Sequence, residues 1–184
     1  MSSSGLDLAN PKAVMPGYWL PPSGAFSRND VAVLHLAGPA SATYLGIEPV
    51  RLPGAGFLAA QAAKGSLVDH GFTNVGFGFQ EISFVNPTTP IAFNGLRMLA
   101  TSPFLGLTRD HLTMLENDRA TGEGGVCMGD SGGPNFFGAP GTSLGNLQVS
   151  LNTGRGYHDC GAGTTTSQRL DLPEVLAFLG PWLE

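Results

Sequence analysis

Residues 122–134 read GEGGVCMGDSGGP and contain the group best suited to covalent chemistry, Ser131. A serine hydroxyl is a weak nucleophile unless a base takes its proton and hydrogen-bond donors stabilise the oxyanion that forms. The glycines at 129, 132 and 133 let the backbone bend sharply, expose the hydroxyl and direct the N–H groups of Gly129 and Ser131 at one point. A glycine-rich surface turn without function is the alternative interpretation of a bare G-x-S-x-G match.

The same residues formally match the nucleophile elbow of α/β-hydrolases, which needs a strand before the serine and a helix after it. A glycine pair precedes Val126, and Gly-Gly-Pro-Asn follows the serine, so no helix is expected to start there. The elbow enzymes also have the chain order serine, acid, histidine. After Ser131 the only histidine is His158, which comes ahead of Asp159 and Asp171. We therefore reject this interpretation.

The segment GDSGGP at 129–134, with Cys127 four positions before the serine, resembles the nucleophile loop of the chymotrypsin/trypsin-like serine proteases. DVAVL at 30–34 resembles the family strand that carries the catalytic aspartate, and its spacing to the serine is similar to that in the family. Weaker resemblances follow in the family's order and extend the likeness over roughly residues 13–184. They are GFG at 76–78, VSLN at 149–152, Cys160, and RLDLP at 169–173 with the final helix.

The resemblance implies a serine endopeptidase that acts on a polypeptide substrate, or binds a protein inhibitor, and needs no cofactor or metal. Ser131 is expected to attack the peptide carbonyl, Asp30 to orient a histidine, and the N–H groups of Gly129 and Ser131 to form the oxyanion hole. Gly125, at the position that sets pocket charge in the family, brings no carboxylate, so apolar or medium-sized side chains are the expected preference. The expected substrate-binding residues are Gly125, Met128, Ser150, Leu151 and Asn152.

The catalytic histidine of the family is not at its expected place. It should lie well upstream of Asp30, but only 29 residues precede Asp30 and none is histidine. The four histidines, at 35, 70, 111 and 158, are interpreted as surface or packed residues. The chain thus resembles a protease truncated at its N-terminus, expected to be inactive alone. The alternatives are a non-catalytic homologue that acts as a protein-binding module, and a chain complemented in trans by a separate histidine-bearing lobe.

Two neighbouring features of the site also follow from this segment. Asp130 corresponds to an acid that pairs with the mature N-terminal amine in many family members, and the sequence shows no partner for it. Cys127 and Cys160 are compatible, by composition alone, with one bridge or two buried thiols. The resemblance implies a disulfide between them, and hence an oxidising compartment and a secreted or extracytoplasmic parent protein.

The elements that must position these residues are predicted to be strands. The chain holds 27 glycines and 14 prolines, which disfavour a helical bundle. From residue 66 on, short apolar runs recur between turn signals, as in antiparallel barrels. We expect an all-β protein: a trypsin-like double β-barrel with an incomplete N-terminal barrel, plus a C-terminal helix.

The expected organisation has four parts. Residues 1–53 would be an irregular lead-in and a remnant of the first barrel, with a buried strand at 30–36. Residues 54–65 would link the barrels, and 66–172 would form the second barrel with the nucleophile loop. Residues 173–184 would form the helix, with Asp171 and Glu174 as a capping box and Pro181 loosening the last turn.

Composition excludes several other classes of protein. A chain that is 42% hydrophobic and 12% charged is not intrinsically disordered. A net charge of −5 provides no electrostatic footprint for nucleic acid. No apolar run approaches the roughly 18 residues that a membrane-spanning helix needs, and the first residues show no secretory signal.

Overall fold

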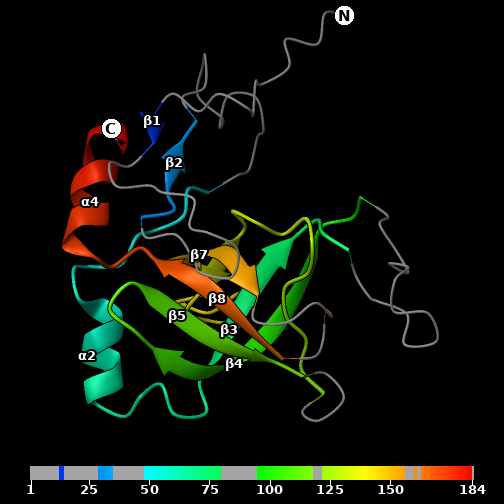
Figure 1. Cartoon of the computed structure of the whole chain (residues 1–184). Helices are drawn as coiled ribbons and strands as arrows, with labels where there is room; N and C mark the ends of the chain where they lie inside the picture. The colour runs from blue at the N-terminus through cyan, green and yellow to red at the C-terminus, as the bar shows by residue number, and fades with distance from the viewer. Residues whose placement is uncertain are drawn as a thin grey trace, which may run out of the picture.

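Six antiparallel strands close into a β-barrel (Figure 1). The computed structural model describes residues 13–14, 29–34, 48–79, 95–117, 122–155, 160 and 163–183. Around the barrel the strand order is β3-β4-β5-β8-β7-β6, and β6 closes it by pairing with β3. The strands are β3 (Gly71–Gly76), β4 (Met98–Leu107), β5 (His111–Glu116), β6 (Pro134–Phe136), β7 (Gln148–Arg155) and β8 (Gly163–Arg169).

The predicted all-β class is confirmed, with one closed barrel among the described residues. The only other sheet in those residues is a two-stranded one, β1 (Ala13–Val14) paired antiparallel with β2 (Ala32–Val33). Figure 1 shows this small sheet beside α4, on one side of the barrel. In the part of the chain that the structure describes, no helix is long and apolar enough to cross a membrane.

The strand predicted at 30–36 is shorter and less buried than expected. Val31 is buried, but Ala32 is exposed and Leu34 is 43% exposed, so the apolar run does not lie between two packed layers. Residues 35 and 36 lie outside the described part of the chain. The run was interpreted as buried on both faces because it is nearly continuous, whereas in the structure β2 pairs with the two-residue strand β1.

Two short α-helices flank the barrel in the part of the chain that the structure describes. Helix α2 (Phe57–Ala63) lies within the segment predicted as a linker, and its sequence, FLAAQAA, is rich in the residue with the highest helix propensity. Helix α4 (Pro173–Leu179) begins with proline in its first turn, as predicted. It continues into a 3₁₀ turn, η1 (Gly180–Trp182), which contains Pro181.

The capping box predicted for α4 is wrong. The N-cap residue is Leu172, and no side chain caps this helix. The Asp171 carboxylate instead accepts a 2.8 Å hydrogen bond from the N–H of Leu58, near the start of α2. Both Asp171 oxygens also accept hydrogen bonds from the Arg169 guanidinium at 2.8 Å. The carboxylate therefore binds Arg169 and the start of α2 and does not cap α4.

The apolar core of the described residues has two main parts, besides the buried Cys127–Cys160 pair with Phe79 packed against it. The larger fills the barrel and is covered by α2; its buried members are Leu58, Leu67, Phe72, Leu112, Met114, Phe137, Leu147 and Val149. The smaller joins the segment before β2 to the end of β8 and to α4, through Val31, Leu170, Leu172 and Val175. The second cluster is what fixes residue 31, and therefore its neighbour Asp30, against the barrel.

The inward face of the barrel changes from apolar to polar along its strands. On β3 the sequence runs from Phe72 to Asn74, and on β5 it runs from Leu112 and Met114 to Glu116, all buried. The buried amide of Asn74 donates to Ser102 at 2.6 Å. Because Gly76, the next inward position on β3, lies against the Asp130 side chain, the polar end is the end that carries the nucleophile loop.

Candidate functional site

The loop that carries Ser131 is held through the carboxylate of the preceding residue, Asp130. One carboxylate oxygen accepts the N–H of Gly78 at 2.7 Å, and the other accepts the N–H of Cys127 at 2.8 Å. The partners of Asp130, which the sequence did not show, are these two backbone N–H groups. Among the described residues Asp130 forms no ion pair, and its negative charge is stabilised by backbone dipoles.

Three backbone hydrogen bonds then shape the loop around the serine. The N–H of Asp130 donates to Cys127 O at 3.1 Å, that of Gly133 to Asp130 O at 2.9 Å, and that of Gly132 to Asn152 O at 2.8 Å. Gly129 and Gly132 have φ angles of 94° and 79°, which strain any other residue. Among the described residues, the N–H groups of Gly129 and Ser131 donate to no protein acceptor, and both residues are exposed.

Two of the expected substrate-binding residues have their side chains inside the barrel. Ser150 is fully buried, and its hydroxyl accepts a hydrogen bond from Asn135 at 3.0 Å. Asn152 is 3% exposed, and its amide donates to Asp130 O at 3.2 Å. The Asn152 side chain therefore supports the nucleophile loop, and its backbone N–H and carbonyl are also bonded to that loop, at Gly133 and Gly132.

The other expected substrate-binding residues lie in different surroundings. Leu151 is half-buried and packs against the cluster that contains Val31. Met128 is 47% exposed, directly before Gly129. Cys127 and Cys160 form a disulfide with their Cα atoms 5.2 Å apart, as the resemblance implied. This bridge ties the loop to the start of the segment that leads into β8.

Sequence reasoning missed Glu116. Its side chain is 1% exposed, and its carboxylate accepts the N–H of Val126 at 2.6 Å. A Cβ atom on Gly125 would lie 2.3 Å from Glu116 Cγ, so residue 125 has to be glycine while the glutamate is there. The buried carboxylate of Glu116 thus lies against Gly125, which has no carboxylate of its own. The signal was available in HLTMLE at 111–116, where an acid occupies an inward position of an alternating strand.

Asp30 lies at the β5–β8 side of the barrel, and its N–H donates to the Gln168 side chain at 3.2 Å. Burial raises the pKa of the Asp30 carboxyl, and the nearby His111 opposes that rise. Gln168 pairs with Leu151 across β7 and β8, and the next residue on β7, Asn152, accepts the N–H of Gly132. Asp30 is therefore attached to β8 and the serine loop to the adjacent strand β7, one residue apart in the register of this pair.

Neither described histidine lines the cavity beside the serine loop. His70 packs between two aromatic rings, stacked on Phe137 at 4.1 Å and edge-on to Phe72 at 4.8 Å, and its Nε2 is 2.7 Å from Phe137 O. His111 begins β5. His35 and His158 lie outside the described residues. No group of three His, Cys, Asp or Glu side chains in the described ranges could hold a metal ion.

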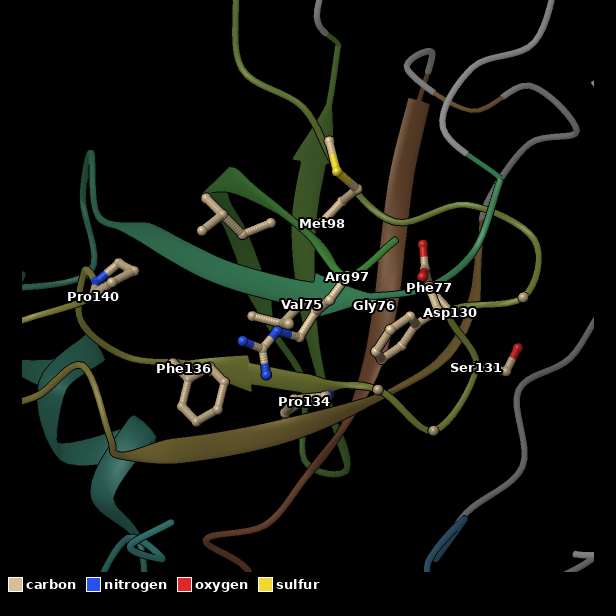
Figure 2. Close-up of a pocket in the computed structure, with 14 residues that line it drawn as sticks. Val75, Gly76, Phe77, Arg97, Met98, Asp130, Ser131, Pro134, Phe136 and Pro140 are labelled. Carbon is tan, nitrogen blue, oxygen red and sulfur yellow. The ribbon is translucent and has the colours of Figure 1, made fainter. Parts of the chain in front are cut away.

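A cavity of about 700 Å³ lies beside the loop (Figure 2). The loop backbone from Gly129 to Gly133 forms one wall, and residues of β3, β4 and β6 form the others. Apolar side chains dominate these walls, among them Val75, Phe77, Met98, Leu99, Pro134 and Phe136. Arg97 is the cation in the lining.

Comparison of the chain with protein-family models and with curated proteins finds no match.

Proposed function

We propose that this chain provides the nucleophile and oxyanion hole of a serine endopeptidase of the trypsin-like type. Ser131 is the nucleophile, and Asp30 orients a histidine that the described residues do not supply. The N–H groups of Gly129 and Ser131 bind the oxyanion. The closed antiparallel barrel and the Cys127–Cys160 disulfide are compatible with this family, and the disulfide is consistent with an extracellular location.

The observation that carries the proposal is the distribution of hydrogen bonds in the loop. The N–H groups of Asp130, Gly132 and Gly133 are used to build the bend. Those of Gly129 and Ser131 flank the exposed serine and donate to no acceptor among the described residues. Two preorganised donors next to a hydroxyl are what the stabilisation of a tetrahedral oxyanion requires.

The reaction follows from these positions. An imidazole takes the proton from Ser131 Oγ as the oxygen attacks the carbonyl carbon of the substrate. The oxyanion accepts hydrogen bonds from the two N–H groups, and the C–N bond then breaks as the proton passes to the leaving amine. Water attacks the resulting ester, and its proton returns through the imidazole to Ser131. Without the imidazole, kcat is expected to fall by a factor on the order of a million.

Labelling with a fluorophosphonate tests this proposal, because the reagent forms a bond to an activated serine with loss of fluoride. We expect the 184-residue chain alone to remain unlabelled. We expect labelling to appear once the chain is extended by the in-frame sequence encoded upstream of Met1, if that sequence carries a histidine. The Ser131→Ala and Asp30→Asn forms of the extended chain should lose the label or react far more slowly.

Three results would overturn the proposal. They are stoichiometric labelling of the chain alone, an upstream sequence without histidine, and an extended, folded chain that does not label. The last two favour the alternative function, a non-catalytic homologue that binds proteins. Specificity is tested with peptides that have an apolar or a basic residue before the scissile bond. Gly125 predicts a preference for apolar residues, whereas the adjacent carboxylate of Glu116 predicts a preference for basic ones.

A further inference from the structure

The cavity beside the serine loop has an unusual concentration of exposed apolar side chains at its rim. Phe77 is 53% exposed, Met98 is 49% exposed and Leu99 is 60% exposed. All three line the same cavity, together with the less exposed Val75 and Phe136. An apolar patch that surrounds a cavity is typical of a binding surface, whereas scattered exposed apolar residues need no explanation.

Arg97 is the cation among the residues that line this groove. Of its two charged lining residues, Asp130 has both carboxylate oxygens occupied by the N–H groups of Gly78 and Cys127. Arg97 is exposed, and among the described residues it forms no ion pair or hydrogen bond. Figure 2 shows its guanidinium directed into the groove on the side of Pro134 and Phe136. A guanidinium beside apolar walls offers planar, paired donors for a carboxylate.

The groove adjoins the serine loop, since Gly129 and Ser131 are among its lining residues. In Figure 2 the Arg97 guanidinium lies apart from the Ser131 hydroxyl, on the side of Phe136. The groove therefore extends from the serine loop to Arg97, and a group that pairs with Arg97 lies away from the reacting atom.

We propose that the groove is a second binding site for the polypeptide substrate, which takes a segment with an acidic side chain next to a large apolar one. The acidic side chain pairs with Arg97, and the apolar side chain is buried against Val75, Met98 and Phe136. A polypeptide occupant follows from the proposed endopeptidase function, on which this inference rests. The preference for an acidic side chain follows from charge complementarity, because the Arg97 guanidinium is the charged group of the groove that has no partner among the described residues.

The test measures binding of two labelled peptides to the 184-residue chain. They are acetyl-Gly-Leu-Phe-Glu-Gly-amide and the same peptide with Gln in place of Glu, each followed by fluorescence anisotropy. We expect the Glu peptide to bind about tenfold more tightly at low salt, with the preference reduced as salt is added. Arg97→Gln should remove the preference, and Met98→Ser should weaken both peptides to a similar extent.

The matched control is Lys64→Gln, which removes one positive charge from an exposed position at the end of α2. It should leave the preference for Glu intact. Equal affinity for the two peptides, no binding of either, or a preference that survives in Arg97→Gln would each overturn the inference. Because binding is measured without acylation, the outcomes separate the two proposals. Selective peptide binding together with an extended, folded chain that fluorophosphonate does not label rejects the endopeptidase alone, and labelling of the extended chain without peptide selectivity rejects the groove alone.

Discussion

At the scale of single residues, Asp130 holds the serine loop through contacts that depend on its chemical type. Its carboxylate joins Gly78, in the segment after β3, to the disulfide-bonded Cys127, and its backbone carbonyl accepts from Gly133 and Asn152. The sequence identified this residue only as an acid whose charge needed a partner. Backbone N–H groups could not be recognised as that partner, because they carry no sequence signature and become available only when residue 78 is brought beside residue 127.

We expect Asp130→Asn to destabilise the chain. An amide retains one acceptor oxygen and places an NH₂ group against one of the two N–H donors, so that donor loses its partner. The cost of an unsatisfied buried donor is about 1–3 kcal/mol in the free energy of unfolding, measurable by urea denaturation. Asp69→Asn, at an exposed position, is the matched control and should change stability by less than about 0.5 kcal/mol. Equal stability of the two variants would contradict the role of the Asp130 hydrogen bonds.

A second prediction at this scale concerns pH. Burial raises the pKa of Asp30, against the opposing effect of His111, so the folded chain binds this proton more tightly than the unfolded chain does. The contribution of Asp30 to stability is therefore present below its unfolded-state pKa and is lost as the pH rises through its folded-state pKa. We expect Asp30→Asn to gain stability relative to the unmodified chain over that range.

Urea unfolding from pH 3 to pH 8 measures this effect, with Asp69→Asn again as the control. The stability difference between Asp30→Asn and the unmodified chain should be smallest at pH 3, grow through the acid range and then stay level. A difference that is constant with pH, or one that shrinks as the pH rises, would show that burial does not raise the pKa of the Asp30 carboxyl.

At the scale of elements, the strands were predictable and the helix caps were not. Alternation and turn signals over 66–172 predicted an antiparallel barrel, because the period of the side chains along a strand is local information. Asp171 and Glu174 have the spacing of a capping box, but Arg169 and the start of α2 bind Asp171 instead. Helix α2 was missed because its seven residues lie between proline and glycine breaks, which favoured a linker.

The pair of Arg169 and Asp171 provides the prediction for this scale. Both side chains are nearly inaccessible, at 6% and 0%, and Arg169 also donates to the carbonyls of Thr108 and Arg109. Asp171→Ala leaves a buried guanidinium without its counter-charge and the N–H of Leu58 without its acceptor. We expect a loss of about 3–5 kcal/mol in the free energy of unfolding.

The control for this variant is Arg109→Ala, since the Arg109 side chain is 74% exposed and its contact with Asp110 is 3.8 Å long. It should cost less than about 1 kcal/mol. Helix content followed by circular dichroism adds a second measurement, because Asp171→Ala should also weaken α2. A stable Asp171→Ala variant with unchanged helix content would refute the proposed link between β8 and α2.

At the scale of the whole molecule, the sequence predicted the barrel class and the disulfide through a few specific residues. GDSGGP, Cys127 and Cys160 led to the bridge that the structure contains. The expected remnant of an N-terminal barrel does not form a barrel among the described residues, where residues 1–53 contribute β1, β2 and Val31. Long-range packing of this kind depends on which segments meet, and the residue types of 30–34 could not show that Leu34 stays exposed.

The disulfide gives a prediction for global stability. It joins positions that are 33 residues apart, for which loop-closure entropy predicts about 3–4 kcal/mol of stabilisation. We expect dithiothreitol to lower the free energy of unfolding by this amount, and Cys127→Ser with Cys160→Ser to reproduce the effect without reductant. The double variant should not respond to dithiothreitol. Unchanged stability on reduction would mean that the bridge does not constrain the unfolded chain.

The hydrogen bond from Leu58 to Asp171 joins residues that are 113 positions apart. During synthesis on the ribosome, at about 5–20 residues per second, Leu58 is made roughly 6–23 seconds before its acceptor. A seven-residue helix does not persist on its own in water over such a time. Helix α2 is therefore among the first segments of the barrel region to be translated and among the last to be completed.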